Sequence, residues 1–270
     1  ETGSLLVTGG VNASTGSPNI TRDLLRVTGA GSVIAASGNI TIGADGTEPF
    51  GVLVASNEGA VEAADFTLGR NGFLMLGGSG TDWSSAAATF QTWNAAEEAG
   101  TLSGTPINMQ TDSGGLVFNH TGDITLANTI TSTASGNDLT GGGLLNVAGN
   151  TTLTGNLTAF GGDIDVRGGT LVINSNMYEG QGFAGTTQAL PQVIDISGGK
   201  LVLNGSSGFQ QTIGGSSTRS SVVTVRNGGV LGGNATVGQT TVTNGGVLSP
   251  GNSPGTLTID GDLLFNAGAS

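Results

Sequence analysis

The feature that most constrains this chain is a repeated unit in which short runs of alternating residues are separated by glycine. The segment VTVRNGGVL (223–231) returns as TTVTNGGVL (240–248), 17 residues later. Upstream, IDVRGGTLVIN (164–174) returns as IDISGGKLVLN (194–204), 30 residues later. Looser copies occur at 24–43 and 65–76. Each unit consists of two stretches of apolar alternation joined by a polar or glycine-rich turn.

The repeat predicts both the local structure and the way in which the units stack. Alternation with a period of two is typical of half-buried β-strands, and Asn-Gly and Gly-Gly pairs supply the positive φ angles of sharp corners. Self-similarity at about 20–30 residues is typical of stacked architectures. We therefore expect an all-β fold, a right-handed parallel β-helix (solenoid), in which residues 1–270 form one domain. Val, Leu and Ile would stack inside it, and Thr, Asn and Ser would face water.

Two other all-β architectures fit the repeat less well. A β-propeller requires four-stranded blades with a period of about 40–50 residues, and the chain has no such period. A β-sandwich would have a more aromatic core, whereas aromatic residues make up 4% of this chain. Because the chain has 51 glycines and few large side chains, we expect a core that is narrow and long.

Charge and composition exclude several classes of partner. The net charge is −12, and the seven Lys and Arg residues are scattered along the chain. Binding of nucleic acid requires clustered basic residues that neutralise phosphates, so we expect no nucleic-acid partner, and an anionic membrane surface is disfavoured for the same reason. The chain has no Cys and therefore no disulfide framework. It also lacks the run of about 18 apolar residues that a transmembrane helix needs.

Two stretches depart from the repeat, and the longer one contains both tryptophans. Within 77–114, the segment from Asp82 to Gly100 has the pattern of a short helix, with Trp83, Phe90 and Trp93 at i, i+7 and i+10 on one face. Glu97 and Glu98 stand at the unfavourable end of this helix for its dipole. The aromatic face either packs on the flank of the coil or binds a partner, because Trp is favoured at binding hot spots.

The second departure covers residues 176–192. It contains Tyr178, the only tyrosine of the chain, together with Phe183. A long surface loop is one interpretation of this stretch. The other is a contact surface, in which these two aromatic side chains bind a partner.

Catalytic motifs are suggested in two places, but each lacks the groups that its chemistry needs. TDSGG (111–115) resembles the sequence around the nucleophile of chymotrypsin-like proteases, and His120 is the only histidine. His120 follows Ser113 by seven residues, which leaves it little freedom to act as the base, and we expect it at a turn or on the surface of the coil. Asp163 and Asp165 should face solvent beside Arg167 without the groove and aromatics of a glycosidase.

Metal and cofactor sites are not expected either. SGNDLTGGG (135–143) resembles a single calcium-binding nonapeptide, but such sites require aspartates from adjacent repeats. The glycine-rich stretches are not followed by a helix that could cradle a phosphate. The sequence therefore predicts no catalytic residues, no metal site, no cofactor and no enzyme activity.

The repeats resemble the passenger-associated repeat of autotransporters, the type V secretion proteins of Gram-negative bacteria. The phrases that carry the resemblance are FNHTGDITLAN, GGTLVIN and GGVLSPGNSPGTLTIDGDL, within 114–175 and 223–270. The resemblance implies a passenger domain that is exported through a C-terminal outer-membrane barrel, which these 270 residues are not expected to include. It also implies a location at the bacterial cell surface or outer membrane, or release outside the cell.

A passenger of this type is expected to be an adhesin associated with virulence. Its stalk would attach to a host cell-surface protein, a matrix protein or a glycan, or to other bacteria through self-association. Two alternatives stay open at this stage. One is an enzyme scaffold that acts on polysaccharide or protein, and the other is a purely structural stalk whose binding function lies elsewhere in a parent chain.

Overall fold

A computed structural model describes residues 24–43, 51–69, 72–78, 95–109, 114–132, 143–177, 192–207, 221–251 and 255–270, together with the backbone of strands at 4–8, 12–15, 19–20, 210–213 and 216–219. The regular elements among these residues are all β-strands. The described residues include no helix that is both long and apolar enough to cross a membrane. The fold is thus all-β, as the alternation predicts.

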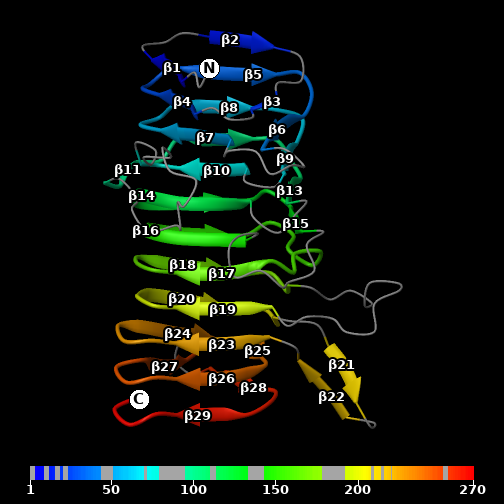
Figure 1. The fold of residues 1–270 in the computed structure, drawn as a ribbon, viewed down its shortest axis with the longest axis vertical. Coiled ribbons are helices and arrows are strands. Elements are labelled where there is room, and N and C mark those ends of the chain that lie inside the picture. Colours follow the sequence, from blue (N-terminus) through cyan, green and yellow to red (C-terminus); the bar gives the residue numbers. More distant parts are fainter. Residues whose placement is uncertain are drawn as a thin grey trace.

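The largest sheet has sixteen strands, which stack along the long axis of the molecule (Figure 1). Each strand of its main path pairs in parallel with the strand from the next repeat of the chain. This path consists of β1 (Ser4–Thr8), β4 (Leu24–Thr28), β7 (Gly51–Ser56), β10 (Gly72–Leu76), β14 (Gly115–Leu126), β16 (Gly143–Leu153), β17 (Asp163–Val166), β19 (Val193–Ile196), β23 (Val222–Val225), β26 (Gln239–Val242) and β29 (Leu263–Phe265). The remaining strands of the sheet are β11 (Glu97–Glu98), β18 (Thr170–Ile173), β20 (Gly199–Leu203), β24 (Gly229–Gly233) and β27 (Val247–Pro250).

Two smaller parallel sheets run beside the first. One contains β2 (Asn12–Thr15), β5 (Val33–Ala36), β8 (Ala60–Glu62) and β12 (Thr101–Ser103), and the other contains β3 (Asn19–Ile20), β6 (Ile40–Ile42), β9 (Phe66–Leu68), β13 (Ile107–Met109) and β15 (Ile130–Ser132). Two isolated pairs complete the fold, namely β25 (Thr236–Val237) with β28 (Thr258–Ile259), and the antiparallel hairpin of β21 (Gln210–Ile213) with β22 (Ser216–Arg219). We call one pass of the chain through these sheets a rung.

The pairing register confirms the repeats that the sequence contains. Val223 pairs with Thr240, which is the 17-residue repeat, and Ile164 pairs with Ile194, which is the 30-residue repeat. The repeat length varies because residues are inserted between rungs, whereas the strands keep their places. The repeated phrases are therefore hydrogen-bonded neighbours.

Alternation along the strands places one set of side chains in a continuous core. In β17, β19 and β23 every second residue is buried, and these residues join a single cluster that extends from Val27 to Val242. The first inner row is formed, rung by rung, by Leu25, Leu53, Leu74, Leu116, Leu144, Ile164, Ile194, Val223, Thr240 and Leu263. The core is narrow and long, as the composition predicts.

Stacked glycines form the corner between the two strands of the later rungs. Gly199 has a φ of +67°, in the region that favours glycine, and a Cβ at this position would lie 2.4 Å from the carbonyl oxygen of Gly169. Gly199 in turn pairs with Gly229 on the following rung. The paired glycines are thus required both by the backbone conformation and by the close approach of one rung to the next.

The expected extent of the first departure from the repeat is wrong at its C-terminal side. Residues 95–100 are not helical, because Glu97 and Glu98 form β11, which pairs with β14. β12 and β13 follow as ordinary rung strands, paired with β8 and β9. These two glutamates thus pair as a strand instead of ending a helix, where their charges would have been unfavourable for the helix dipole. Residues 79–94, which contain most of the expected helix, lie outside the described residues.

Candidate interaction site

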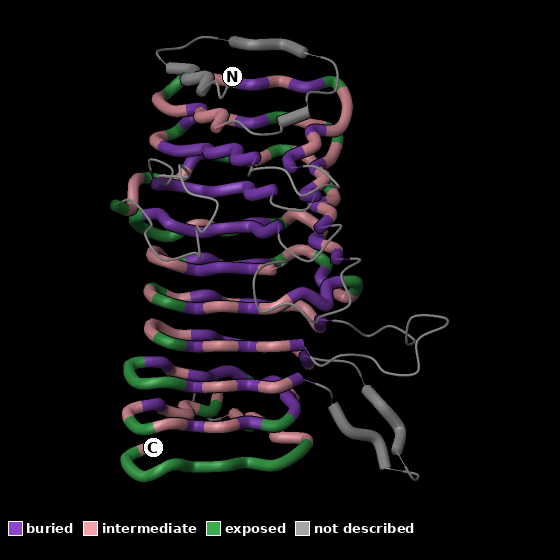
Figure 2. Tube along the Cα trace, viewed as in Figure 1, coloured by how far each residue is buried: buried purple, intermediate pink, exposed green. Residues whose placement is uncertain are grey.

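An apolar row runs along the outside of the rungs around β10. Val54, Met75 and Val117 alternate with core residues and therefore point away from the core, yet each is 0% exposed. With Val52, Phe73 and Leu145 they form a second hydrophobic cluster, separate from the main core. β7 and β10 are consequently buried on both faces, which appears as continuous purple in the middle rungs of Figure 2.

Farther along the stack the same row becomes polar. Leu145 pairs with Asp165, which is followed by Asp195 and then by Thr224. These three residues are only partly buried. Asp165 accepts a hydrogen bond from Arg167 Nε at 2.8 Å, so it lies close to Arg167 as expected. Asp163 Oδ1 instead accepts from Val193 N–H of the next rung at 2.9 Å. Asp195 accepts from Arg226 Nε at 2.7 Å.

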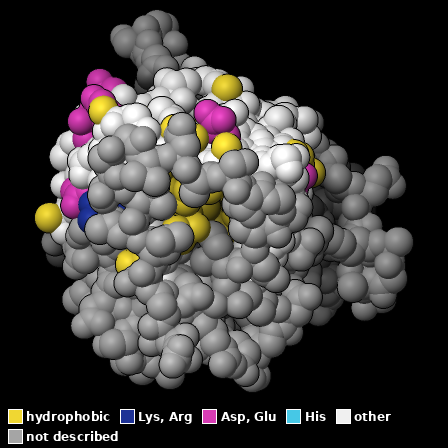
Figure 3. All heavy atoms as spheres, turned by 90° about the horizontal axis from the view of Figure 1, so that it is seen from above, with side chains coloured by type: hydrophobic (Ala, Val, Ile, Leu, Met, Phe, Trp, Pro, Cys, Tyr) yellow, Lys and Arg dark blue, Asp and Glu magenta, His cyan; other side chains and the backbone are white. Residues whose placement is uncertain are grey.

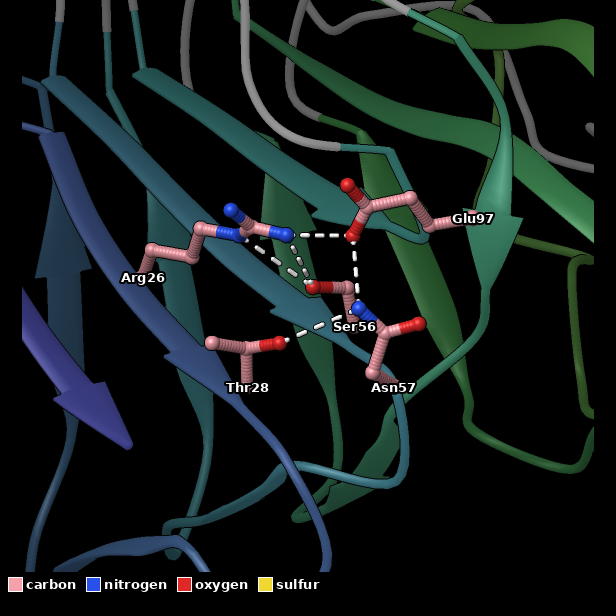
Figure 4. Close-up of polar contacts among 5 residues, drawn as sticks. All are labelled: Arg26, Thr28, Ser56, Asn57 and Glu97. Atoms are coloured by element: carbon pink, nitrogen blue, oxygen red, sulfur yellow. Dashed lines mark hydrogen bonds and ion pairs between the residues drawn. The ribbon is translucent and has the colours of Figure 1, made fainter. Parts of the chain in front are cut away.

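We call the rungs whose outer row is buried, around β7, β10 and β14, the covered region. Side chains from three strands form a polar cluster at its edge (Figure 4). Arg26 on β4 forms an ion pair with Glu97 on β11, and both side chains are largely buried, at 20% and 26% exposed. The guanidinium of Arg26 also donates to Ser56 Oγ, at 3.1 Å from Nη2 and 3.3 Å from Nε. Strands that are far apart in sequence thus meet at one charge pair.

Asn57 completes this cluster from the turn that follows β7. Its Nδ2 donates to Glu97 Oε2 at 2.8 Å and to Thr28 Oγ1 at 3.2 Å. Its φ of +48° lies in the left-handed region, which Asn tolerates better than most residues. Its backbone N–H donates to Glu98 O at 2.7 Å. The turn and β11 therefore hold each other in place.

The hydrogen bonds of this cluster hold the returning chain in place. The Glu97 carboxylate oxygen accepts from Arg26 and Asn57, and Ser56 Oγ accepts from Arg26. Ala99 also forms an isolated antiparallel β-bridge with Ser56, and Gly100 N–H donates to Ala55 O at 3.0 Å. This clamp fixes residues 95–100, where the chain returns to the rungs after the segment that contains both tryptophans.

The five aromatic residues predicted as partner-binding lie outside the described residues. These are Trp83, Phe90, Trp93, Tyr178 and Phe183. The structure describes the points from which their segments leave and to which they return. The first segment leaves after Gly78 and returns at Ala95, and the second leaves after Met177 and returns at Gln192. Both segments are therefore attached to paired rungs at each end.

The hairpin of β21 and β22 was not predicted from the sequence. This hairpin projects from the stack between β20 and β23 (Figure 1). Ile213 pairs with Ser216, so Gly214 and Gly215 connect the two strands. A Gly-Gly pair between two short runs is a recognised hairpin signal, and it could have been found in QQTIGGSSTR (210–219).

His120 lies inside the molecule, which corrects the expectation of a turn or surface residue. It is 1% exposed on β14, between rungs whose Gly77 and Gly149 leave room for it, since a Cβ on either would lie within 2.5 Å of its atoms. Its Nε2 is 2.8 Å from Thr151 Oγ1. Burial lowers the pKa of His120, while the Thr121 carbonyl and the Asp123 charge oppose this effect. Ser113, the other residue of the protease-like motif, lies outside the described residues.

The described residues contain no group of three His, Cys, Asp or Glu side chains that could hold a metal ion. Residues 135–142 of the calcium-like nonapeptide lie outside the described part of the chain. Searches with the whole chain gave no matching family model, no matching curated protein and no matching solved structure.

Proposed function

We propose that this chain is a right-handed parallel β-helix that forms the passenger stalk of a bacterial cell-surface adhesin of the autotransporter class. It would be carried on the outer membrane of a Gram-negative bacterium or released from it. Its role is mechanical and interfacial, and the proposal assigns it no catalysis and no cofactor. The stalk would hold attachment segments away from the membrane and toward host proteins or glycans.

The observation that carries this proposal is the parallel register that continues from β1 to β29. Each rung buries its inner row against the next, so the core is one continuous column rather than a globule. Connections between parallel strands of one sheet are right-handed in about 98% of cases, which supports the proposed hand. A stack whose peptide groups bond from rung to rung resists bending, as a stalk requires.

The attachment surface is proposed to lie on the segments between rungs. The segment of Trp83, Phe90 and Trp93 and the segment of Tyr178 and Phe183 hold aromatic residues of the kind that dominate binding interfaces. Rigid scaffolds that present loops are a common arrangement for binding proteins. The clamp of Arg26 and Glu97 supports this assignment, since it holds the return of the first segment on the stack.

Adhesion of beads coated with the purified chain tests the proposal. The panel consists of epithelial cells, immobilised matrix proteins and a glycan array, with an acidic protein of matched charge as the background. We expect binding above this background to at least one target. Absence of binding to every target would contradict the adhesin assignment and favour a purely structural stalk.

Two sets of alanine substitutions then locate the surface. One set replaces Trp83, Phe90 and Trp93, and the other replaces Tyr178 and Phe183. Loss of interfacial hot spots weakens binding by about tenfold or more, so one set should reduce adhesion by this factor. Thr241→Ala, on the polar outer row, is the control and should bind normally. If both sets bind like the unmodified chain, the attachment surface lies elsewhere.

A further inference from the structure

Several corners of the stack carry the pair Asn-Gly, in which the asparagine side chain is chemically labile. The structure describes three such pairs, namely Asn204–Gly205, Asn227–Gly228 and Asn244–Gly245. The asparagine of each pair is exposed. Because glycine has no side chain to shield its own backbone nitrogen, all three pairs are equally suited to the reaction by sequence. A difference between them has to come from the fold.

The reaction needs only groups of the chain, base and water. The backbone nitrogen of the glycine gives its proton to base and forms a bond with Cγ of the preceding asparagine. The Cγ–Nδ2 bond breaks, and the nitrogen leaves as ammonia with a proton from the solvent, so that a succinimide ring remains. Water then opens the ring at either carbonyl, which gives aspartate or isoaspartate. The first step requires a glycine N–H that is free of its hydrogen bond.

In two of the three pairs the glycine N–H is bonded to the next rung. Gly228 N–H donates to Gly245 O at 3.1 Å, and Gly245 N–H donates to Gly268 O at 3.0 Å. The first of these turns is also closed by Gly229 N–H, which donates to Arg226 O at 2.8 Å, and the second has the equivalent bond. The nitrogen therefore reaches the asparagine only when the turn opens locally.

The third pair has an open glycine nitrogen. Gly205 N–H has no hydrogen-bond partner among the described residues. The N–H groups on either side of it are bonded, since Asn204 N–H donates to Ile173 O at 2.9 Å and Ser206 N–H donates to Asn176 Oδ1 at 2.9 Å. The nitrogen that must attack is thus the one that the rung leaves free.

One contact opposes the reaction at this pair. Asn204 Nδ2 donates to Asn174 Oδ1 at 2.7 Å, and the contact is exposed to solvent. A single exposed bond between two neutral side chains contributes little, and the side chain can leave it without disturbing the rung. Release of Gly228 or Gly245 instead breaks two backbone bonds of a stacked turn. The backbone bonds therefore decide the order of reactivity.

We propose that Asn204 is a site of spontaneous modification, at which the folded chain forms a succinimide and then aspartate and isoaspartate. Asn227 and Asn244 are protected by the stack. The site lies between β20, which ends at Leu203, and the hairpin, whose first strand begins at Gln210. Isoaspartate adds a methylene group to the backbone at this junction. The proposal concerns the chemistry of the corners and is independent of what the attachment segments bind.

The modification also changes the charge of the chain, because it replaces a neutral amide with a carboxylate. The net charge is −12 before the reaction, and acidic side chains occur at several places on the end of the stack that Figure 3 shows. The product is more acidic by one charge. It should therefore be retained longer on an anion-exchange column, which follows the reaction in the intact chain.

Incubation of the whole 270-residue chain in mildly alkaline buffer, made with water enriched in heavy oxygen, tests the proposal. Heavy oxygen marks each event that occurs during incubation, and fragmentation of peptides, digested in ordinary water, assigns it to a residue. In urea the three sites should react at similar rates, because each asparagine precedes glycine. In the folded chain Asn204 should react about tenfold faster than Asn227 or Asn244, whose turns each hold two more hydrogen bonds.

Equal rates at the three sites of the folded chain, or no reaction at Asn204 while the chain in urea reacts fully, would overturn the proposal. Asn204→Gln disfavours the ring by adding a methylene group, and this variant should form the retained species more slowly. Asn227→Gln is the matched control and should form it at the unmodified rate. If both variants slow the reaction equally, the stack does not protect Asn227. Circular dichroism verifies the fold of each variant, and Asn204→Asp provides the elution standard and a second variant without the labile amide.

Discussion

The rungs around β10 and the rungs from β17 to β26 share the same inner rows and differ in the row that points outward. In the first region this row reads Val54, Met75 and Val117, all buried, and in the second it passes through Asp195 and Thr224, both partly exposed. The same pattern of inner residues thus occurs with a buried apolar outer row in one region and with a partly exposed polar outer row in the other. The inner rows make a rung stack on its neighbours, and the outer row decides whether that rung is covered.

The two regions should therefore be stabilised in different ways. Burial of a Val, Leu, Phe or Met side chain contributes about 1.5–3 kcal/mol, so a covered rung gains from both of its faces. A rung of the polar region gains from its inner row and from partly exposed ion pairs such as Arg226–Asp195, which contribute about 1 kcal/mol or less. The covered region is consequently expected to be the more stable part of the stack.

The largest effect is expected from a charge placed on the covered row. Val117→Asp would bury a carboxylate between Met75 and Leu145, where no basic partner stands beside it on the row. We expect a loss of about 3–5 kcal/mol in the free energy of unfolding, the size of an uncompensated buried charge. Urea unfolding followed by circular dichroism measures this loss.

Thr241→Asp is the matched control for that substitution, because it introduces the same charge on the same row in the polar region. A partly exposed site of this kind should tolerate it to within about 0.5 kcal/mol. Equal losses for the two variants would show that the outer row does not distinguish the regions.

A smaller effect is expected from glycines, and here the comparison is between a crowded and an open position. A Cβ on Gly72 would lie 1.9 Å from the carbonyl oxygen of Ile42, so Gly72→Ala should cost up to about 3 kcal/mol through overpacking. Gly228 has a φ of +81° and nothing within 4 Å of such a Cβ. Gly228→Ala should therefore cost only the strain of a left-handed residue, about 1–2 kcal/mol.

Thermal unfolding of these two variants gives the comparison directly. A cost for Gly228→Ala as large as that for Gly72→Ala would mean that backbone conformation, rather than contact between rungs, selects glycine in both places.

The fold was predictable where the sequence repeats itself. The phrases that begin at Ile164 and Ile194 are self-similar because they occupy equivalent places, and the structure pairs them. The strands β11 to β13 were not predicted, because Glu97 and Glu98 belong to no repeated phrase and Glu97 is held by Arg26, which is 71 residues away. Local pattern cannot reveal a pairing that depends on so distant a side chain.

The interaction site was predictable only in part. Aromatic composition identified Trp83, Phe90 and Trp93 as unusual, but the outer apolar row consists of Val, Leu and Met, which look the same in sequence whether they point inward or outward. β7 begins with GVLVA, a continuous apolar run, and such a run indicates a strand buried on both faces. The burial of His120 was missed because the polar turn that follows it in sequence suggested a surface position.

Two ion pairs give a finer test of the difference between the regions. Arg26–Glu97 is largely buried, with side chains 20% and 26% exposed, whereas Arg226–Asp195 is more open, at 52% and 33%. Glu97→Gln should lower the free energy of unfolding by about 1 kcal/mol, and Asp195→Asn by less than about 0.5 kcal/mol. Urea unfolding at low and high salt separates them, because salt screens the exposed pair more effectively. A larger cost for Asp195→Asn would contradict the assignment of the clamp.

The smallest effect on stability at neutral pH is expected from His120. Its protonation tests whether the covered region excludes a charge. A carbonyl can only accept, so Nδ1, 3.3 Å from Thr121 O, is the donor, and Nε2 accepts from Thr151 in the neutral ring. Burial lowers the pKa of His120 below its ordinary 6.5, and the unfolded chain therefore binds a proton before the folded chain does. The contribution of His120 to the free energy of unfolding should be constant above about pH 6.5 and should decrease as the pH falls below it.

His120→Gln removes this titration and keeps a polar side chain, so the difference in unfolding midpoint between the two proteins should change only below about pH 6.5. The carboxylates titrate in both proteins and cancel in this comparison. Because His120 is the only histidine, its ring signals in an NMR titration report the folded-state pKa directly. A pKa at or above 6.5 would mean that the Thr121 carbonyl and the Asp123 charge outweigh the effect of burial, and the predicted pH dependence would be wrong.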